Sequence, residues 1–156
     1  MRIRVIAVGT RMPDWVTGGV DTFTQRMPPE CRVEFVEIPV APRGKNADIA
    51  RLRAAEGARM LKLLSAQDLV IALDERGKPW TTVSLAADLA EWLGSGRDVA
   101  LLIGGPDGLD PACRQRAERS VSISGLTLPH AMVRLILAEA LYRAWTVHIN
   151  HPYHRA

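Results

Sequence analysis

The stretch Val99–Ile103, an unbroken apolar run that ends at glycines, constrains the fold of this chain more than any other. Such a run is typical of a strand buried on both faces, as in a parallel sheet. Gly104, Gly105 and Gly108 follow it, so the chain can turn sharply with no side chain blocking a ligand's approach to the backbone. In open α/β sheets, ligands bind at the carboxyl ends of strands. The stretch therefore predicts a parallel sheet with a ligand site at this end, although an ordinary strand-to-helix turn has the same pattern.

The composition of the chain indicates a soluble globular protein. It has 156 residues, of which 47% are hydrophobic and 24% charged, a usual balance for a folded domain. This length favours one domain over residues 1–156. No apolar stretch approaches the length of a membrane span, and the apolar part of the N-terminus is too short for a signal peptide. We therefore expect a cytoplasmic protein with no membrane partner.

The cysteines and histidines do not predict a metal site. Cys31 and Cys113 form no metal-binding spacing and no disulfide framework, so we expect two reduced thiols. Three of the four histidines recur every third residue over 148–154, but Pro152 disfavours a regular helix there. No metal is therefore expected.

The charge of the chain is mildly basic. A formal net charge of +3 permits an anionic partner without demonstrating one. Two groups of cations lie close together in the sequence: Arg43, Lys45, Arg51 and Arg53, then Arg114, Arg116 and Arg119. Each group can equally well be part of a helix face that is exposed to solvent and binds no anionic partner.

Hydrophobic periodicity predicts strands that alternate with helices. The strands are expected at 3–8, 32–38, 69–74, 99–103 and 121–123, with loops at 39–47, 75–79 and 125–129. The helices are expected at 14–25, 48–64, 85–93, 111–119 and 131–145. Ser84 is a good N-cap and Gly94 lies just past the end of the third helix, while Asp110 and Pro111 begin the fourth. This order implies a largely parallel sheet with helices on both faces.

The last of these helices is apolar almost all round, and such a helix is buried on more than one side. Its apolar residues are Met132, Val133, Leu135, Ile136, Leu137, Leu141, Ala144 and Trp145. In a chain this short, a second copy can provide the extra burying surface. We therefore predict a homodimer through the last helix.

The known short motifs exclude several kinds of site. The glycines after the fourth strand match neither the dinucleotide fingerprint nor a phosphate-binding loop, and Pro106 removes a backbone N–H that could face a phosphate. A ligand held through base edges and a carboxylate fits better. There is no acyl-hydrolase motif.

The tail at 148–155 combines histidine, tyrosine and arginine, which can stack on bases or pair with phosphate, although a frayed terminus is the alternative.

Three stretches together resemble one known family. They are Leu101-Leu-Ile-Gly-Gly-Pro-Asp-Gly-Leu109, Ser124-Gly-Leu-Thr-Leu-Pro-His130 with Arg134 and Leu141-Tyr-Arg-Ala144, and Asn150-His-Pro-Tyr-His-Arg155. The N-terminal Ala7-Val-Gly-Thr10, Arg43-Gly-Lys-Asn46, Leu73-Asp74 and Gly77-Lys78 also match. This set resembles the ribosomal large-subunit methyltransferase H family of bacteria, a minimal group of the SPOUT methyltransferases. The resemblance covers nearly the whole chain; Gly125, where the family mostly has alanine or a similar small residue, departs from it.

The resemblance implies a SPOUT-type α/β/α sandwich, with a mostly parallel sheet of five to six strands and a deep trefoil knot in the C-terminal part. Knots are too rare to follow from sequence periodicity, so this expectation comes from the resemblance alone. It also implies a homodimer with S-adenosylmethionine held in the knot. The implied activity is methylation of N3 of a pseudouridine in a stem-loop of 23S rRNA, within the assembled 70S ribosome.

The resemblance also assigns residues to roles. The cofactor-binding residues would be Leu73, Gly104, Gly105, Ile123, Ser124, Gly125, Leu126, Thr127 and Leu128. The candidates for catalysis are His130, Tyr153, His154 and Arg155, with Arg143 as an orienting group, and the tail would close over the cofactor site of the partner subunit. The sequence leaves the proton acceptor open, since His130 can equally well hydrogen-bond the first turn of the last helix. A non-catalytic ribosome-associated RNA-binding factor is the alternative function, and methylation of a different RNA is a third hypothesis.

Overall fold

The strands form one parallel sheet, as the sequence predicts. The computed structural model describes residues 1–155. The five strands are β1 Arg2–Val8, β2 Arg32–Ile38, β3 Leu69–Pro79, β4 Val99–Ile103 and β5 Arg119–Ser122. Their order across the sheet is β2-β1-β4-β3-β5, and every neighbouring pair is parallel.

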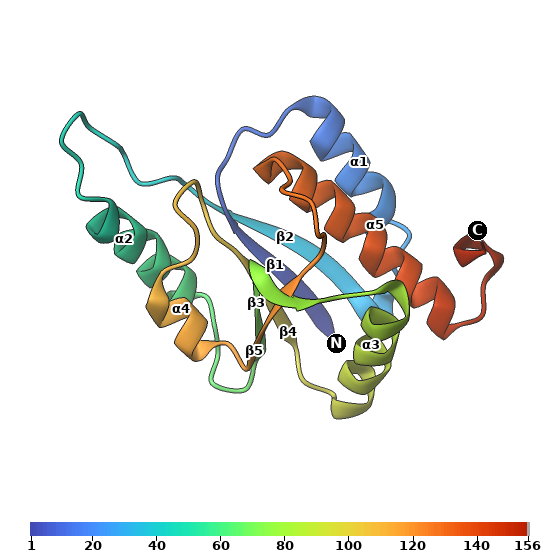
Figure 1. The fold of residues 1–156 in the computed structure, drawn as a ribbon. Helices are drawn as coiled ribbons and strands as arrows, with labels where there is room; N and C mark the ends of the chain where they lie inside the picture. Colours follow the sequence, from blue (N-terminus) through green and yellow to red (C-terminus); the bar gives the residue numbers. More distant parts are fainter. Residues whose placement is uncertain (156) are drawn as a thin grey trace.

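Helices cover both faces of this sheet (Figure 1). They are α1 Asp14–Thr24, α2 Ile49–Lys62, α3 Thr82–Ser95, α4 Pro111–Arg116 and α5 His130–His148, with short 3₁₀ turns η1 Pro29–Cys31 and η2 Pro152–His154. On one face α5 packs between α1 and α3, and on the other α2 packs against α4. No helix within residues 1–155 has both the length and the apolar character needed to cross a membrane.

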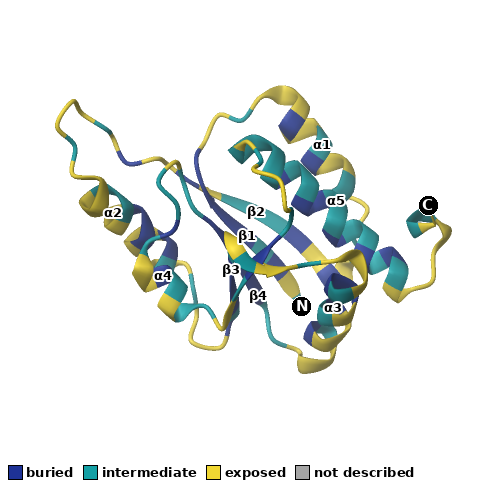
Figure 2. Cartoon of the chain, in the orientation of Figure 1, coloured by how far each residue is buried: buried dark blue, intermediate teal, exposed yellow. Residues whose placement is uncertain are grey.

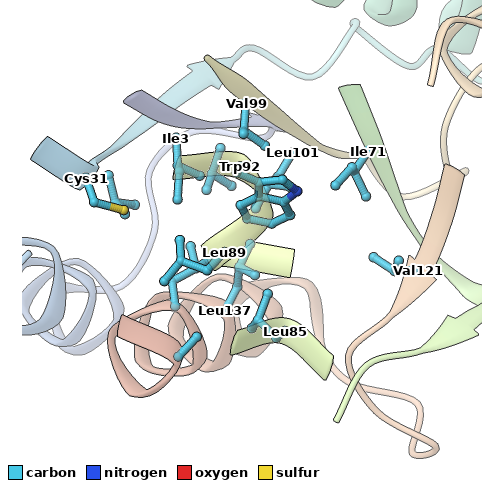
Figure 3. Packing of buried hydrophobic residues seen from close by; sticks show 14 of the residues in the cluster. Ile3, Cys31, Ile71, Leu85, Leu89, Trp92, Val99, Leu101, Val121 and Leu137 are labelled. Carbon is cyan, nitrogen blue, oxygen red and sulfur yellow. The ribbon is translucent and has the colours of Figure 1, made fainter. Parts of the chain in front are cut away.

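The central strand β4 is buried along its whole length, which confirms the expectation from its unbroken apolar run. Its residues alternate between two cores. Val99 and Leu101 pack with Leu89 and Trp92 of α3 on one face (Figure 3), while Leu102 packs toward α2 and α4 on the other. Figure 2 shows the same arrangement as a band of buried residues through the middle of the molecule.

Strand β3 is longer than predicted, and the expected loop at 75–79 is wrong. Val121 of β5 pairs first with Leu73 and then, after a shift in register, with Lys78. Figure 1 shows the light-green end of β3 passing across the orange β5. Gly77 lies at this crossing, where a Cβ would stand 2.6 Å from the Val121 nitrogen. The knot that the resemblance implies stays a prediction.

Several helix ends also differ from the predictions: α2 is Ile49–Lys62 where 48–64 is predicted, and α5 is His130–His148 where 131–145 is predicted. Helix α3 begins at Thr82 because Thr81 is the N-cap: its Oγ1 accepts from the Ser84 N–H at 3.0 Å, and the Ser84 hydroxyl accepts from the Thr81 N–H at 2.8 Å. The helix runs to Ser95, and its left-handed C-cap is Gly96, with a φ of 68°, instead of the predicted Gly94. Helix α4 stops at Arg116 because Arg119 already belongs to β5.

Both cysteines are free and buried, and we expect them to be unreactive in the native protein. Burial raises the pKa of Cys31 to about 12 and that of Cys113 to about 11. Since the thiolate is the nucleophile, a disulfide reagent at pH 8 should react slowly with the folded chain and rapidly with both thiols in denaturant. Rapid reaction of either thiol without denaturant would contradict this prediction.

Candidate functional site

A cavity of about 650 Å³ opens at the carboxyl edge of the sheet, where β4 and β5 end and beside the middle of the longer β3. Its walls are the segments at 73–76, 103–109 and 121–124, completed by Leu126, Leu128, Arg114, His130 and Val133. A volume of this size is usual for small-molecule sites. The cavity lies at the end of the sheet that the glycines after β4 indicate.

The structure brings most of the expected cofactor residues together around this cavity. Those in its wall are Leu73, Gly104, Gly105, Ile123, Ser124, Leu126 and Leu128. Gly125 and Thr127 belong to the same loop but do not line the cavity. A Cβ added at Gly125 would meet no atom of residues 1–155 within 4 Å, so this position can accept a small side chain without rearrangement.

The segment Gly104–Gly108, here called the glycine loop, is closed by a tight turn. The Gly108 N–H donates to the Gly105 carbonyl at 3.0 Å, and Gly108 has a φ of 80°, which favours glycine. A Cβ at Gly104 would stand 2.5 Å from the Leu109 nitrogen, and one at Gly105 would stand 2.8 Å from Val8 Cγ1. These two glycines are therefore required by the packing of the loop itself, and not only by space for a ligand as the sequence suggests.

The rest of the cavity wall combines apolar side chains with the carboxylate of Asp74, which forms ion pairs with Arg76 and Arg114 of the same wall. Leu126 is 75% exposed, an unusual state for a large apolar side chain at the mouth of a cavity. Asp74 Oδ2 lies 3.1 Å from Arg114 Nη2. Burial raises the pKa of Asp74, but hydrogen bonds from Arg76 and the charge of Arg114 outweigh it and hold the pKa below its ordinary value. Asp74 therefore presents an ionised carboxylate in the cavity wall.

His130 contacts the cavity from the first turn of α5, and its ring is held by Arg134. Its Nε2 lies 3.3 Å from Arg134 Nη2. Because a guanidinium cannot accept a hydrogen bond, Nε2 must be the acceptor, and the proton of the neutral ring is on Nδ1. Burial, followed by the charge of Arg134, lowers the pKa of His130.

Arg134 is itself buried, and both of its terminal nitrogens are hydrogen-bonded. It is 3% exposed, and it donates to Glu37 Oε2 at 2.6 Å and to the Gly9 carbonyl at 2.7 Å. His130 thus belongs to a hydrogen-bonded group that joins α5 to the ends of β1 and β2.

The tail residues lie at the other end of α5 from His130. The Tyr153 hydroxyl donates to Glu139 Oε1 at 3.1 Å, and Arg143 Nη2 donates to the same oxygen at 2.6 Å. The Tyr153 ring packs edge-on against Tyr142, with a centroid separation of 4.7 Å. Burial and the neighbouring Glu139 raise the pKa of Tyr153, so its phenol stays protonated.

Comparison with known proteins places this architecture in a family. The family model described as "Predicted SPOUT methyltransferase" matches residues 1–154. The chain belongs to the SPOUT methyltransferase family. It is also 57% identical to the "Ribosomal RNA large subunit methyltransferase H" of Chromohalobacter salexigens over 155 residues, which is 99% of this chain and 100% of that protein.

Within this SPOUT methyltransferase, the structure does not bring all the expected catalytic residues together in one chain. His130 lines the cavity, whereas Arg143 and Tyr153 cluster near the far end of α5, followed by His154 and Arg155. The nitrogen Nδ1 of His154 is buried and has no hydrogen-bond partner within residues 1–155. No group of three or more metal-ligating side chains occurs in the described part of the chain.

Sequence reasoning missed several residues of this SPOUT methyltransferase site. Asp74 follows directly on Leu73 at a strand end, and that position was a usable signal. Glu139 lies four residues before Arg143, the spacing of an ion pair on a helix. Asp107 lies inside the glycine motif after β4, which was a signal of the same kind, whereas Arg114 had none because its partner Asp74 is distant in the sequence.

Proposed function

We propose that this chain is an S-adenosylmethionine-dependent methyltransferase that methylates N3 of a pseudouridine in a stem-loop of 23S rRNA, on the assembled 70S ribosome. The observation that carries the proposal is the cavity at the carboxyl edge, whose walls include most of the residues that the resemblance assigns to the cofactor, in a chain that the family model matches over residues 1–154. The 57% identity to a protein named as a large-subunit rRNA methyltransferase supports the RNA substrate.

The residues around the cavity suit this cofactor. Leu73, Ile123 and Leu128 offer apolar contacts to an adenosine, and the backbone of the glycine loop offers polar groups to its base edge. The exposed Leu126 would be covered by a bound ligand or by a second subunit. When bound, S-adenosylmethionine supplies an electrophilic methyl group on a sulfonium.

The chain's own residues would orient the RNA base and accept its proton, because N3 of a pseudouridine carries a proton that must be lost. Lining up the reacting atoms supplies much of the acceleration. The lone pair on His130 Nε2 already accepts a hydrogen bond from Arg134, so it is not available to take the proton of the base. In our proposal His130 therefore positions the cavity wall. Tyr153 stays protonated and serves as a donor, and Arg143 orients it from 5.1 Å above its ring.

His154 is then our candidate for the proton acceptor, and Arg155 for a contact to the RNA backbone. Imidazole is the side chain that most often acts as a general base. Within residues 1–155 the Nδ1 of His154 has no hydrogen-bond partner, and in our proposal it accepts the proton once the tail meets its substrate. Arg155 is exposed at the end of the tail, where a guanidinium can pair with phosphate.

A homodimer would bring the tail and the cavity together. The cavity lies at the start of the 19-residue helix α5 and the tail at its end. A two-fold axis that pairs two α5 helices antiparallel places the tail of one subunit beside the cavity of the other. We therefore propose an α5-mediated dimer, and light scattering should give twice the chain mass of 17.2 kDa.

The experiment that tests the function is methyl transfer from labelled S-adenosylmethionine. The substrates are 70S ribosomes, free large subunits and naked 23S rRNA, with ribosomes that lack pseudouridine as the control. We expect transfer to 70S ribosomes only, mapped by mass spectrometry to one pseudouridine. Binding of ribosomes with salt-sensitive affinity, but without cofactor binding or transfer, would favour the non-catalytic RNA-binding factor. Transfer to another RNA would favour the third hypothesis.

Removal of residues 150–156 should reduce methyl transfer by about a hundredfold or more, because it removes groups that align and activate the base. We also expect weaker binding of S-adenosylmethionine in calorimetric titration, since the tail would cover the partner's cavity. Tyr153→Phe is the matched variant: it keeps the ring contact with Tyr142 and loses only the hydrogen bond to Glu139. Undiminished transfer by the truncated chain would exclude the tail from catalysis.

A further inference from the structure

The glycine loop is held by charged side chains that lie outside the cavity. Asp107 is in the cavity wall. Its Oδ2 accepts two hydrogen bonds from Arg43, one from Nε at 3.1 Å and one from Nη2 at 2.5 Å. Arg43 is 64 residues away in the sequence, in the connection between β2 and α2, and it does not line the cavity itself. A segment remote from the three strand ends is therefore tied to the loop.

Arg43 is fixed in turn by a buried carboxylate on α2. Its Nη1 donates to Glu56 Oε2 at 3.3 Å and to the Ala41 carbonyl at 2.8 Å. Glu56 is 3% exposed, and its Oε2 also accepts from the Ala41 N–H at 3.0 Å. Because a buried carboxylate is costly without a charged partner, the Glu56–Arg43 pair resists being opened. Arg43 thus bridges a buried anion and the cavity wall.

Helix α2 also supports the glycine loop directly. The second oxygen of Glu56, Oε1, is buried without a hydrogen-bond partner in the described residues, and it would lie 3.4 Å from a Cβ added at Gly105. Arg53, three residues earlier on the helix, donates from Nη1 to the Asp107 carbonyl at 3.5 Å. Side chains of α2 therefore lie against the glycine loop at Gly105 and at Asp107.

We propose that Arg43 and Glu56 are positioning residues that hold the glycine loop in the shape that binds the cofactor. Glu56 orients Arg43, and Arg43 orients Asp107, whose carboxylate lies in the cavity wall. This inference rests on the proposed function, because it names residues that prepare the same site. The connection between β2 and α2 is thereby part of the binding apparatus, although none of its residues lines the cavity itself.

The test is titration of the full chain with S-adenosylmethionine. Arg43→Ala should raise the dissociation constant about tenfold, the effect typical of coupled neighbours. Arg43→Lys should recover little of this loss, since one ammonium cannot reproduce a fork that bonds two carboxylates. Asp107→Asn should weaken binding similarly, and the double variant Arg43→Ala with Asp107→Asn should be little weaker than either single variant.

A matched control separates this role from general stability. Arg59→Ala removes another arginine of the same region, exposed on α2 and without an ion pair within residues 1–155, and should leave the dissociation constant unchanged. Hydrogen exchange of the unliganded proteins provides a direct readout of the loop. Amides at 104–109 should exchange faster in Arg43→Ala than in Arg59→Ala, while those of β4 should not.

The outcomes distinguish this inference from the proposed function. If the unaltered chain does not bind S-adenosylmethionine, the proposed function fails, and the exchange measurement still decides whether the ion pairs hold the loop. If the unaltered chain binds and Arg43→Ala binds equally well, the inference is overturned. Strictly additive losses of binding free energy in the double variant would overturn it as well. So would a lower melting temperature of Arg43→Ala with an unchanged dissociation constant. If Arg43→Ala fails to fold, the dissociation constants of Arg43→Lys and Asp107→Asn provide the same comparison.

Discussion

Replacing Gly104 with alanine is expected to reduce the affinity for S-adenosylmethionine by about a hundredfold while the sheet stays folded. The new Cβ would stand 2.5 Å from the Leu109 nitrogen and 2.7 Å from the Gly108 carbonyl oxygen, both of them backbone atoms. Backbone cannot rotate away as a flexible side chain does, so the glycine loop must open. Overpacking of this kind costs about 1–3 kcal/mol, and here it falls on a loop that forms the cavity wall.

Calorimetric titration measures this effect, and thermal unfolding shows whether the fold survives. Gly94→Ala is the control, because an alanine there meets no atom of residues 1–155 within 4 Å and lies in the last turn of α3. That change should leave the affinity unchanged and should not lower the stability, since glycine is less favourable than alanine within a helix. Unchanged affinity in Gly104→Ala would mean that the shape of the glycine loop does not determine binding.

Much of the fold could be predicted because its signals are local. The run Val99–Ile103 is apolar at every position, and the structure buries it on both faces. Asp110 caps α4 as predicted, with its Oδ2 accepting from the Ala112 N–H at 3.0 Å. Since parallel strands bring their carboxyl ends to one edge, the positions of the strand ends also placed most of the cavity wall.

The remaining features depend on contacts between residues far apart in the sequence. The extension of β3 over 75–79 has no apolar periodicity, because it is formed of charged residues, glycine and proline that pair with β5 only when the chain crosses there. The bond from Arg43 to Asp107 spans 64 residues, and that from Arg134 to the Gly9 carbonyl spans 125. Local pattern cannot reveal such partners.

Gly77→Ala is expected to destabilise the protein by about 3 kcal/mol, which is at the upper end of the overpacking range. Its Cβ would stand within 2.7 Å of three backbone atoms of Ser120 and Val121, where β3 crosses β5. The φ of Gly77 is not positive, so the alanine would not be penalised for its conformation, and the whole effect comes from the crossing. Urea unfolding followed by circular dichroism measures the loss.

Gly44→Ala is the matched control for this variant, because Gly44 also precedes a lysine in a charged segment, but a Cβ there meets no described atom within 4 Å. It should change stability by less than about 0.5 kcal/mol.

In Gly77→Ala we also expect weaker binding of S-adenosylmethionine, since the strand that must move continues directly from the cavity wall at 73–76. If Gly77→Ala were as stable as Gly44→Ala, the two strands could separate without cost, and the crossing would not be a fixed part of the fold. Lost stability with full affinity would instead separate the crossing from the site, and would leave the glycine loop as the wall that determines binding.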